Sequence, residues 1–443
     1  MPGQLAERPS AQDSAVQKSL KSLEFFNELF GKASIKPFAI RLWNGAEWHY
    51  SKESPRFILD LKHPTALQRL LWQPSELSLG EAYITDEFDI HGELEASFEL
   101  AEHLIGRQWR LSEKLSLMRK LLGLPAKRQT GKERGSLNLK GRAHSKQRDA
   151  QAVQYHYNVS NDFYKLWLDQ RMVYSCAYFH NLNDSLDQAQ HNKLDYLCRK
   201  LRLKPGERLL DLGCGWGGLI MHAAERYGVE ALGVTLSQPQ ADLANARIQE
   251  AGLADSCRAE VCDYRDIPAD QQFDKIVSVG MYEHVGEKKL PHYFQKAYRQ
   301  LKSGGVLLNH GITESISNAP KGGPSFIDKY VFPDGELIPI STSLRIAEET
   351  GFEVRDVESL REHYAMTLRL WVKRLEANRD RAIELTSPET YRIWRIYMAG
   401  SAYGFETGRL GLYQSLLVKS GRQASRLPLT RSDWYQQYPS SYH

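Results

Sequence analysis

Apolar runs and helical periodicity alternate along the middle of the chain, from Lys204 to Thr313. The segment "ERLLDLGCGWGGLIMHAAERYG" predicts a strand, a glycine loop and a helix. Helical text such as "QADLANARIQEAG" then separates further strand-like runs, which are "VEALGVTLS", "CRAEVCDY", "FDKIVSVGMYEH" and "GGVLLNHGI". Strands that alternate with helices in this way predict a doubly wound parallel α/β sheet.

The text on either side of this region predicts other elements. Residues 21–107 predict a small α+β domain, with a helix in "SLEFFNELF", strands in "FAIRLWNG" and "AEWHYS", and mainly helical text afterwards. The Asn44-Gly45 pair between alternating aromatic residues is typical of a hairpin turn. After Thr313 come the insertion "SNAPKGGPSFIDKYVFPDGELIP", sheet-like text in "GFEVRDVESL", and aromatic-rich text that predicts helices from Tyr364 to about Lys419.

The 443 residues exceed one ordinary core, so we expect several segments. Residues 1–20 are polar and lack a helical period, which predicts disorder. Residues 21–107 then form the small domain, 108–150 a basic linker, and 151–443 the larger α/β domain.

Charge is unevenly distributed although the net charge of +4 is too small to indicate a nucleic-acid partner. Thirteen Lys and Arg residues lie between Arg107 and Arg148, against Glu113 and Glu133 alone. Together with the amphipathic text "WRLSEKLSLMRKLLGL", this basic block could bind an anionic membrane surface. A solvated tether between domains is an equally good interpretation.

Composition also disfavours some protein classes. No run of about 18 apolar residues occurs, as a membrane-spanning helix would need. The polar N-terminus lacks the apolar core of a secretory signal, which predicts a cytoplasmic location. The five cysteines are odd in number, scattered and without a C-x-x-C pair, which favours reduced thiols over disulfides or a zinc site.

The glycine loop "LLDLGCGWGG" is the most recognisable motif in the chain. Its glycines let the backbone turn sharply and approach a ligand closely, and the following helix N-terminus favours an anionic group. The spacing departs from the dinucleotide fingerprint because of an additional glycine, Gly217. A nicotinamide enzyme would also place an acidic residue where Thr235 stands, at the end of the second strand. Dinucleotide binding is therefore disfavoured.

The text "LLDLGCGWG" resembles the first motif of class I methyltransferases, whose methyl donor is S-adenosylmethionine. The resemblance implies a Rossmann-like fold in which three successive strand ends each contact one part of the methyl donor. The methionine end would meet Asp211 and the loop, the ribose "TLSQPQ", and the adenine "CDY". The implied residues are Asp211, Gly213, Gly215, Gly217, Thr235, Leu236, Ser237, Gln240, Asp263 and Tyr264. A turn without any ligand is the alternative.

A more specific resemblance runs from about Gln154 to Ser420. The texts "QYHYNVSNDFYKLWLD", "YSCAYF", "LDLGCGWGG", "GVTLSQPQ", "MYEHVG" and "HGI" together are similar to cyclopropane-fatty-acyl-phospholipid synthases, mycolic acid cyclopropane synthases and fatty-acid methyltransferases. The small N-terminal domain resembles that of the bacterial members that act on phospholipids.

In that family a bicarbonate ion lies beside the transferred methyl group. The resemblance implies that its ligands here are Cys176, Glu283, His310, Ile312 and Tyr364. Of these, Cys176 and Ile312 would offer mainly backbone groups. Tyr174 and Ser175 match residues that contact the methyl donor.

Each of these residues also has a simpler interpretation. Cys176 could be a small buried hydrophobic residue and His310 a core histidine, and Glu283 could pair with a nearby lysine. One departure from the family stands out, because Ser401 lies where members often carry a cysteine in a C-terminal helix. A mechanism that required that thiol would fail in this chain.

The resemblance implies an enzyme that transfers a methylene group from S-adenosylmethionine to a cis double bond of an unsaturated phospholipid, with bicarbonate as general base. The enzyme would be cytoplasmic and peripherally bound to the inner face of the membrane, and the resemblance also suggests a homodimer. Alternatives are a fatty-acid methyltransferase that forms 10-methylene or 10-methyl chains, a small-molecule N-methyltransferase, and a lipid-binding protein without activity. Aromatic faces could stabilise a cationic intermediate, and the candidates are Tyr174, Tyr178, Phe179, Trp371 and Tyr403.

Overall fold

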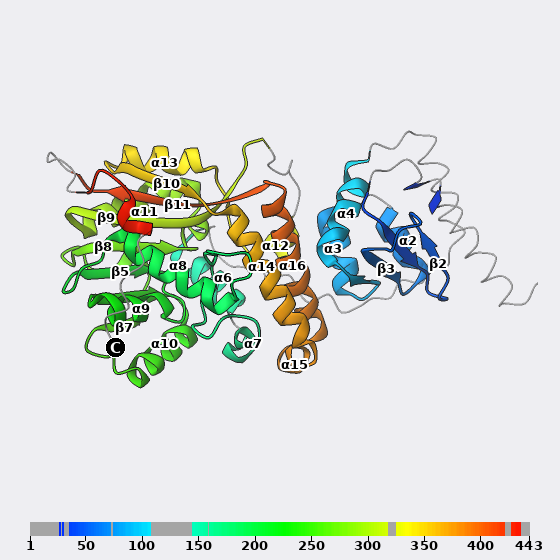
Figure 1. The fold of residues 1–443 in the computed structure, drawn as a ribbon, viewed down its shortest axis with the longest axis horizontal. Helices are drawn as coiled ribbons and strands as arrows, with labels where there is room; N and C mark the ends of the chain where they lie inside the picture. The colour runs from blue at the N-terminus through cyan, green and yellow to red at the C-terminus, as the bar shows by residue number, and fades with distance from the viewer. Residues whose placement is uncertain are drawn as a thin grey trace, which may run out of the picture. The chain divides into compact units, whose positions relative to one another are not determined.

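The computed structural model divides the chain into two compact units, which Figure 1 shows as a ribbon. It describes residues 26–27, 29–30, 35–71, 74–107, 144–157, 159–317, 325–420 and 427–435. One unit comprises Met1–Ser136 with Pro324–Phe326 and Pro388–Ile396, and the other holds the remainder. The predicted disorder of residues 1–20 and most of the predicted basic linker, 108–143, lie outside the described residues.

A four-stranded sheet with the order β2-β1-β3-β4 organises the N-terminal unit. Its strands are β1 (Phe38–Arg41), β2 (Glu47–His49), β3 (Phe57–Leu61) and β4 (Phe88–Gly92). Helices α2 (Pro64–Leu71), α3 (Glu76–Ile84) and α4 (Ser97–Gly106) accompany them.

The predicted hairpin in this unit is confirmed. Strands β1 and β2 pair antiparallel, and Gly45 adopts a φ of 85° in the turn between them. The prediction of mainly helical text after the hairpin was wrong for β3 and β4. Both strands are only five residues long, and a short apolar run such as "FILDL" has too little periodicity to separate strand from helix.

The larger unit is built on a seven-stranded sheet with the order β10-β11-β9-β8-β5-β6-β7. The strands are β5 (Arg208–Leu212), β6 (Glu230–Thr235), β7 (Cys257–Val261), β8 (Phe273–Val279), β9 (Leu301–Glu314), β10 (Glu353–Ser359) and β11 (Leu410–Val418). The five strands from β9 to β7 are parallel, which confirms the Rossmann-like α/β fold.

Strand β11 corrects two predictions, because it lies antiparallel between β9 and β10 within text that predicted only helices. The sheet is therefore mixed and not wholly parallel. The strand escaped prediction because Gln414 and Ser415 interrupt its apolar run, although both side chains are buried. Gln414 lies opposite His310 of β9, so its polar side chain has a partner inside the sheet.

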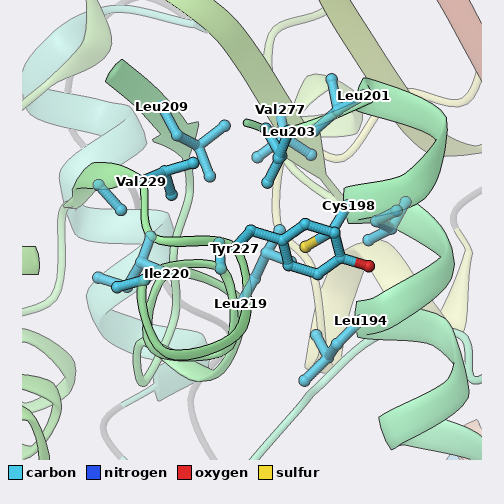
Figure 2. Close-up of a cluster of buried hydrophobic side chains, with 14 of the residues drawn as sticks. Leu194, Cys198, Leu201, Leu203, Leu209, Leu219, Ile220, Tyr227, Val229 and Val277 are labelled. Atoms are coloured by element: carbon cyan, nitrogen blue, oxygen red, sulfur yellow. The ribbon is translucent and has the colours of Figure 1, made fainter. Parts of the chain in front are cut away.

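Helices cover the sheet, and alternate strand residues supply the two cores. Figure 2 shows one core, where Leu194, Cys198 and Leu201 lie near Tyr227 and Leu209. This core packs α8 (Leu186–Leu201) and α9 (Gly218–Tyr227) on the sheet. Neighbouring strand residues such as Leu210 belong to the second core, with α11 (Leu290–Gln300) and α13 (Ile340–Glu349). The remaining helices are α6 (Lys146–Tyr157), α7 (Asn161–Lys165), α10 (Gln238–Glu250), α12 (Phe326–Tyr330), α14 (Arg361–Ala377), α15 (Arg379–Leu385), α16 (Pro388–Glu406) and α17 (Ser432–Tyr435).

Within the described ranges, none of the helices has the length and apolar character that would let it span a bilayer.

Candidate active site

A pocket opens at the carboxyl ends of strands β5, β6, β7 and β8, where ligands bind in sheets of this kind. Most of the residues predicted to contact a methyl donor line it, namely Tyr174, Ser175, Asp211, Gly213, Gly215, Thr235, Leu236, Gln240, Asp263 and Tyr264. The predicted residues Gly217 and Ser237 are not part of the lining. Gly217 begins α9 with a φ of 78°, and the Ser237 hydroxyl caps α10 by accepting from the Gln240 N–H.

The glycine loop turns at the edge of this pocket. Gly213 has a φ of 93°, and a Cβ there would meet Met281 at 3.1 Å. The backbone N–H groups of Gly213 and Cys214 both donate to the Val234 carbonyl, which fixes the loop against the end of β6. Helix α9 begins directly after the loop, so the predicted strand, loop and helix are all confirmed.

Two buried ionisable side chains lie at one end of the pocket. The Asp211 side chain is buried, and burial raises its pKa to about 7. The Oδ1 atom of Asp211 has no hydrogen-bond partner among the described residues. Lys193 of α8 also lines the pocket, its Nζ donates to Ser175 Oγ at 2.8 Å, and burial lowers its pKa to about 8.

Sequence reasoning missed Lys193, although the sequence carries a signal for it. Leu186, Gln190, Lys193 and Leu197 recur at helical spacing along α8, so two polar residues interrupt an apolar stripe. Both of these polar side chains are buried. Polar residues on the apolar face of a helix need a partner or a ligand.

Helix α6 contributes a charged side chain to the pocket lining. Asp149 lines the pocket and accepts from Arg265, which also donates to Asp263. Two basic residues of α6 form ion pairs, Lys146 with Asp266 and Arg148 with Asp334. The sequence did not predict Asp149 or Arg265 as pocket residues.

The five residues predicted to hold bicarbonate do not line this pocket. The structure places Glu283 just after β8 and both His310 and Ile312 in β9. Glu283 Oε1 accepts from the Ile312 N–H at 2.7 Å. The Ile312 N–H is therefore occupied by the carboxylate, so its role in this arrangement is to orient Glu283.

Two buried polar atoms of this group lack a partner among the described residues. Glu283 Oε2 is an unsatisfied acceptor, and burial raises the pKa of Glu283 to about 7. His310 Nδ1 accepts from Gln414 Nε2 at 3.1 Å, so the ring proton resides on Nε2, which has no partner. Burial holds the pKa of His310 well below its usual value, which keeps the ring neutral.

An acceptor and a donor without partners have the chemistry that would hold a bicarbonate ion. Its oxygens can accept from His310 Nε2–H, and its O–H can donate to Glu283 Oε2. A buried acceptor and a buried donor that are both unsatisfied cost about 1–3 kcal/mol each. A ligand that satisfies both groups would remove that cost.

Cys176 and Tyr364 are connected to each other through the Leu360 carbonyl. The Cys176 thiol lies 3.8 Å from the Leu360 carbonyl, which also accepts from the Tyr364 N–H. The Leu360 N–H in turn donates to Leu412 of β11, opposite Ile312. Burial raises the pKa of the Cys176 thiol, so this residue is a poor nucleophile.

Tyr397 of α16 is a further residue that sequence reasoning missed. Tyr174 and Ser401 lie close to its buried hydroxyl, and the Glu283 charge acts on it. Burial raises the pKa of Tyr397 to about 12, so the phenol remains protonated. Ser401, the departure from the family pattern, therefore lies beside Tyr397.

An aromatic wall borders the pocket beside Tyr174. The Tyr174 ring lies 5.3 Å from Trp371 and 5.4 Å from Trp167, measured between centroids. The structure gives the other candidate aromatics different neighbours. Tyr178 stacks on His363 at 4.8 Å, with Phe179 near the same ring, and Tyr403 faces Arg409.

The segment 173–177 passes between the two groups of residues and is held from both sides. Gln190 Nε2 of α8 donates to the carbonyls of Val173 and Ser175. From the other side, Thr367 Oγ1 of α14 accepts from the Ala177 N–H at 3.0 Å. Hydrogen bonds from two helices therefore fix the segment that carries both Ser175 and Cys176.

Comparison with known proteins agrees with this geometry. The family "Mycolic acid cyclopropane synthetase" matches residues 144–415, and a "Domain of unknown function (DUF7884)" matches residues 25–104. The chain is 42% identical to a "Probable fatty acid methyltransferase" of Pseudomonas putida over 404 residues, which cover 90% of this chain and 96% of that protein. It is 38% identical over 273 residues to "Cyclopropane mycolic acid synthase 1" of Mycobacterium tuberculosis, covering 59% and 94% of the two chains.

A solved structure of similar shape is the mycolic acid cyclopropane synthase CmaA1 in complex with SAH and CTAB. It superimposes with a TM-score of 0.58 at 37% identity, and covers 61% of this chain and 98% of its own.

Proposed function

Since the chain belongs to the mycolic acid cyclopropane synthetase family and is an S-adenosylmethionine-dependent methyltransferase, we propose that it forms cyclopropane fatty acids in unsaturated phospholipids. It transfers a methylene group from S-adenosylmethionine to the cis double bond of an acyl chain. The observation that carries this proposal is the pair of unsatisfied buried atoms, Glu283 Oε2 and His310 Nε2, which are linked through β9 and the segment 173–177 to the donor pocket.

The reaction needs a base as well as a methyl donor. The π electrons of the alkene form a bond to the sulfonium methyl carbon while its C–S bond breaks, which releases S-adenosylhomocysteine. The resulting carbocation closes to a ring when one proton leaves the new methyl group. Bicarbonate, when bound, supplies a general base for that proton.

The residues of this chain orient the base and exclude water. His310 Nε2–H and Glu283 Oε2 present one donor and one acceptor to a bound oxyanion. The Ile312 N–H holds the Glu283 carboxylate in place. Water would capture the cation, and the enclosed aromatic surroundings of Tyr174 and Trp371 disfavour its entry.

A second candidate has the same first step and a different ending. A relative that matches nearly the whole chain carries the name "Probable fatty acid methyltransferase", which favours a branched product. In such an enzyme a hydride shifts between the two former alkene carbons, so that the cation lies on the carbon that bears the new methyl group. Loss of a proton from that methyl group leaves a 10-methylene group, which a reductase partner converts into 10-methyl.

Product analysis separates the candidates. Purified protein is incubated with labelled S-adenosylmethionine and vesicles of unsaturated phospholipid, and the lipids are examined by mass spectrometry and proton NMR. Ring protons at high field support the cyclopropane proposal, and exomethylene protons support the branched product. Methylation of an amine, without any lipid product, would contradict both.

The substrate class implies action at a membrane surface, and we place the enzyme on the cytoplasmic side as a peripheral protein. What supports this part of the proposal is the excess of basic residues between Arg107 and Arg148.

A further inference from the structure

Lys193 is a buried cation for which the methyl-transfer chemistry has no role so far. Its side chain is 1% exposed and forms part of the donor pocket wall. Its neighbours on α8, Leu194 and Cys198, pack into the core in Figure 2, so the helix cannot easily turn the ammonium toward water. An ammonium group held in such a place is costly unless it has a partner or a function.

The hydrogen bond of Lys193 determines how the Ser175 hydroxyl is directed. A lysine ammonium has only donors, so Ser175 Oγ accepts from Nζ, at 2.8 Å. The single O–H of Ser175 must then point elsewhere, and Ser175 lines the pocket. Gln190 holds the Ser175 carbonyl at 2.8 Å, so the backbone cannot swing away. Ser175 thus presents a donor to the pocket with a positive charge behind it.

Asp211 provides the complementary group in the same pocket. Its buried Oδ1 has no partner among the described residues, and it is an acceptor. One pocket wall therefore carries a free acceptor, and another carries a donor backed by a cation. This arrangement matches the two charged groups of an amino acid, an ammonium for Asp211 and a carboxylate for Ser175.

We propose that Lys193 is a positioning residue that orients the Ser175 hydroxyl toward the carboxylate of the methyl donor and makes that end of the pocket favourable for an anion. The proposal rests on the use of S-adenosylmethionine and does not depend on which lipid accepts the methyl group. Lys193 acts through Ser175 and through its charge, and it takes no part in bond making.

Binding of two matched ligands tests this role. Calorimetry measures the Kd of S-adenosylhomocysteine and of S-adenosyl-3-thiopropylamine, which is the same molecule without its carboxylate. The wild type should bind the carboxylate-bearing ligand at least about tenfold more tightly, as expected for a hydrogen bond to a charged group. In Lys193→Met and in Ser175→Ala, the ratio of the two Kd values should fall to within about threefold of unity.

The ratio reports on the carboxylate and not on the general state of the pocket. Loss of fold would weaken both ligands together, and circular dichroism checks for it. Lys193→Gln keeps a donor to Ser175 without the charge, so it should retain part of the preference, and it substitutes for Lys193→Met if that variant does not fold. A wild type without preference, or a Lys193 variant that keeps the full preference, would overturn the proposal. Failure of the lipid assay alone would leave it standing, since no lipid is present.

Discussion

Replacement of Glu283 by glutamine is the sharpest test of the proposed base site. The amide oxygen can still accept from the Ile312 N–H, which Glu283 Oε1 does at 2.7 Å. The other end of the side chain changes from an acceptor into a donor, at the position of the unsatisfied Oε2. Glu283→Gln therefore keeps the local fold and removes one hydrogen-bond acceptor.

The expected magnitude follows from that single change. A hydrogen bond to a charged group is worth about 1.5–3 kcal/mol, which corresponds to roughly a 10- to 150-fold decrease in kcat. The Kd for S-adenosylmethionine should change by less than about threefold, because Glu283 is not among the residues that line the donor pocket. Turnover and donor affinity should therefore separate.

Stability should respond in the opposite direction to activity. Burial raises the pKa of Glu283 from 4.5 to about 7, so the folded protein binds this proton more tightly than the unfolded chain does. The wild type consequently loses stability as the pH rises through this interval, by about 3 kcal/mol once the carboxylate is fully charged. Glu283→Gln cannot lose a proton there, so it should melt higher than the wild type at pH 8 and close to it at pH 5.

Three assays decide the matter: turnover with unsaturated phospholipid vesicles, calorimetry of donor binding, and thermal melting at the two pH values without added bicarbonate. Glu287→Gln is the matched control, since Glu287 is an exposed carboxylate close by in sequence. A variant with normal turnover would remove Glu283 from the mechanism. A parallel loss of donor affinity and turnover would instead place it in the donor pocket.

Three other changes to the chain have defined outcomes. Cys176→Ala should keep most of the turnover and be milder than the glutamine variant, because burial raises the pKa of the thiol and makes it a poor nucleophile. Complete inactivity in the lipid assay would require a role for sulfur. Neutralising the basic residues within 127–142 should weaken sedimentation with anionic vesicles at low salt. Lys146 and Arg148 of α6 are kept, because both are paired with carboxylates. Unchanged binding would identify this segment as a tether. Gly311→Ala would place a Cβ inside the ring of Tyr282 and should lower the free energy of unfolding by about 1–3 kcal/mol, which thermal melting measures. Gly106 has open space around it, so Gly106→Ala is the control and should not lower stability in this way. Equal melting of the two variants would refute the packing argument.

Most of the residues that the sequence assigned to the methyl donor line one pocket, because they follow strands in short contiguous motifs. A strand, a glycine loop and a helix are local features, so Asp211 and Gly213 could be placed without tertiary information. The proposed bicarbonate ligands were assigned only by resemblance, since they come from separate elements of the fold. That strand was itself mispredicted, because a buried Gln414 has no local signature and acquires its partner only when β9 and β11 pair.

The two groups of the site are joined by the segment 173–177, which residues outside the predicted motifs hold in place. In the segment 173–177, Ser175 belongs to the residues of the donor pocket, and Cys176 belongs to the residues proposed to hold bicarbonate. The position of the segment depends on α8 and α14. Both helices hold it through hydrogen bonds from Gln190 and to Thr367, which are directional and short. A shift of this segment would move the methyl donor relative to Glu283 without altering a residue that contacts either ligand. The buried polar residues of α8 are thus better explained by the need to fix that separation than by stability, because a well-packed apolar residue at Lys193 or Gln190 would cost the fold less.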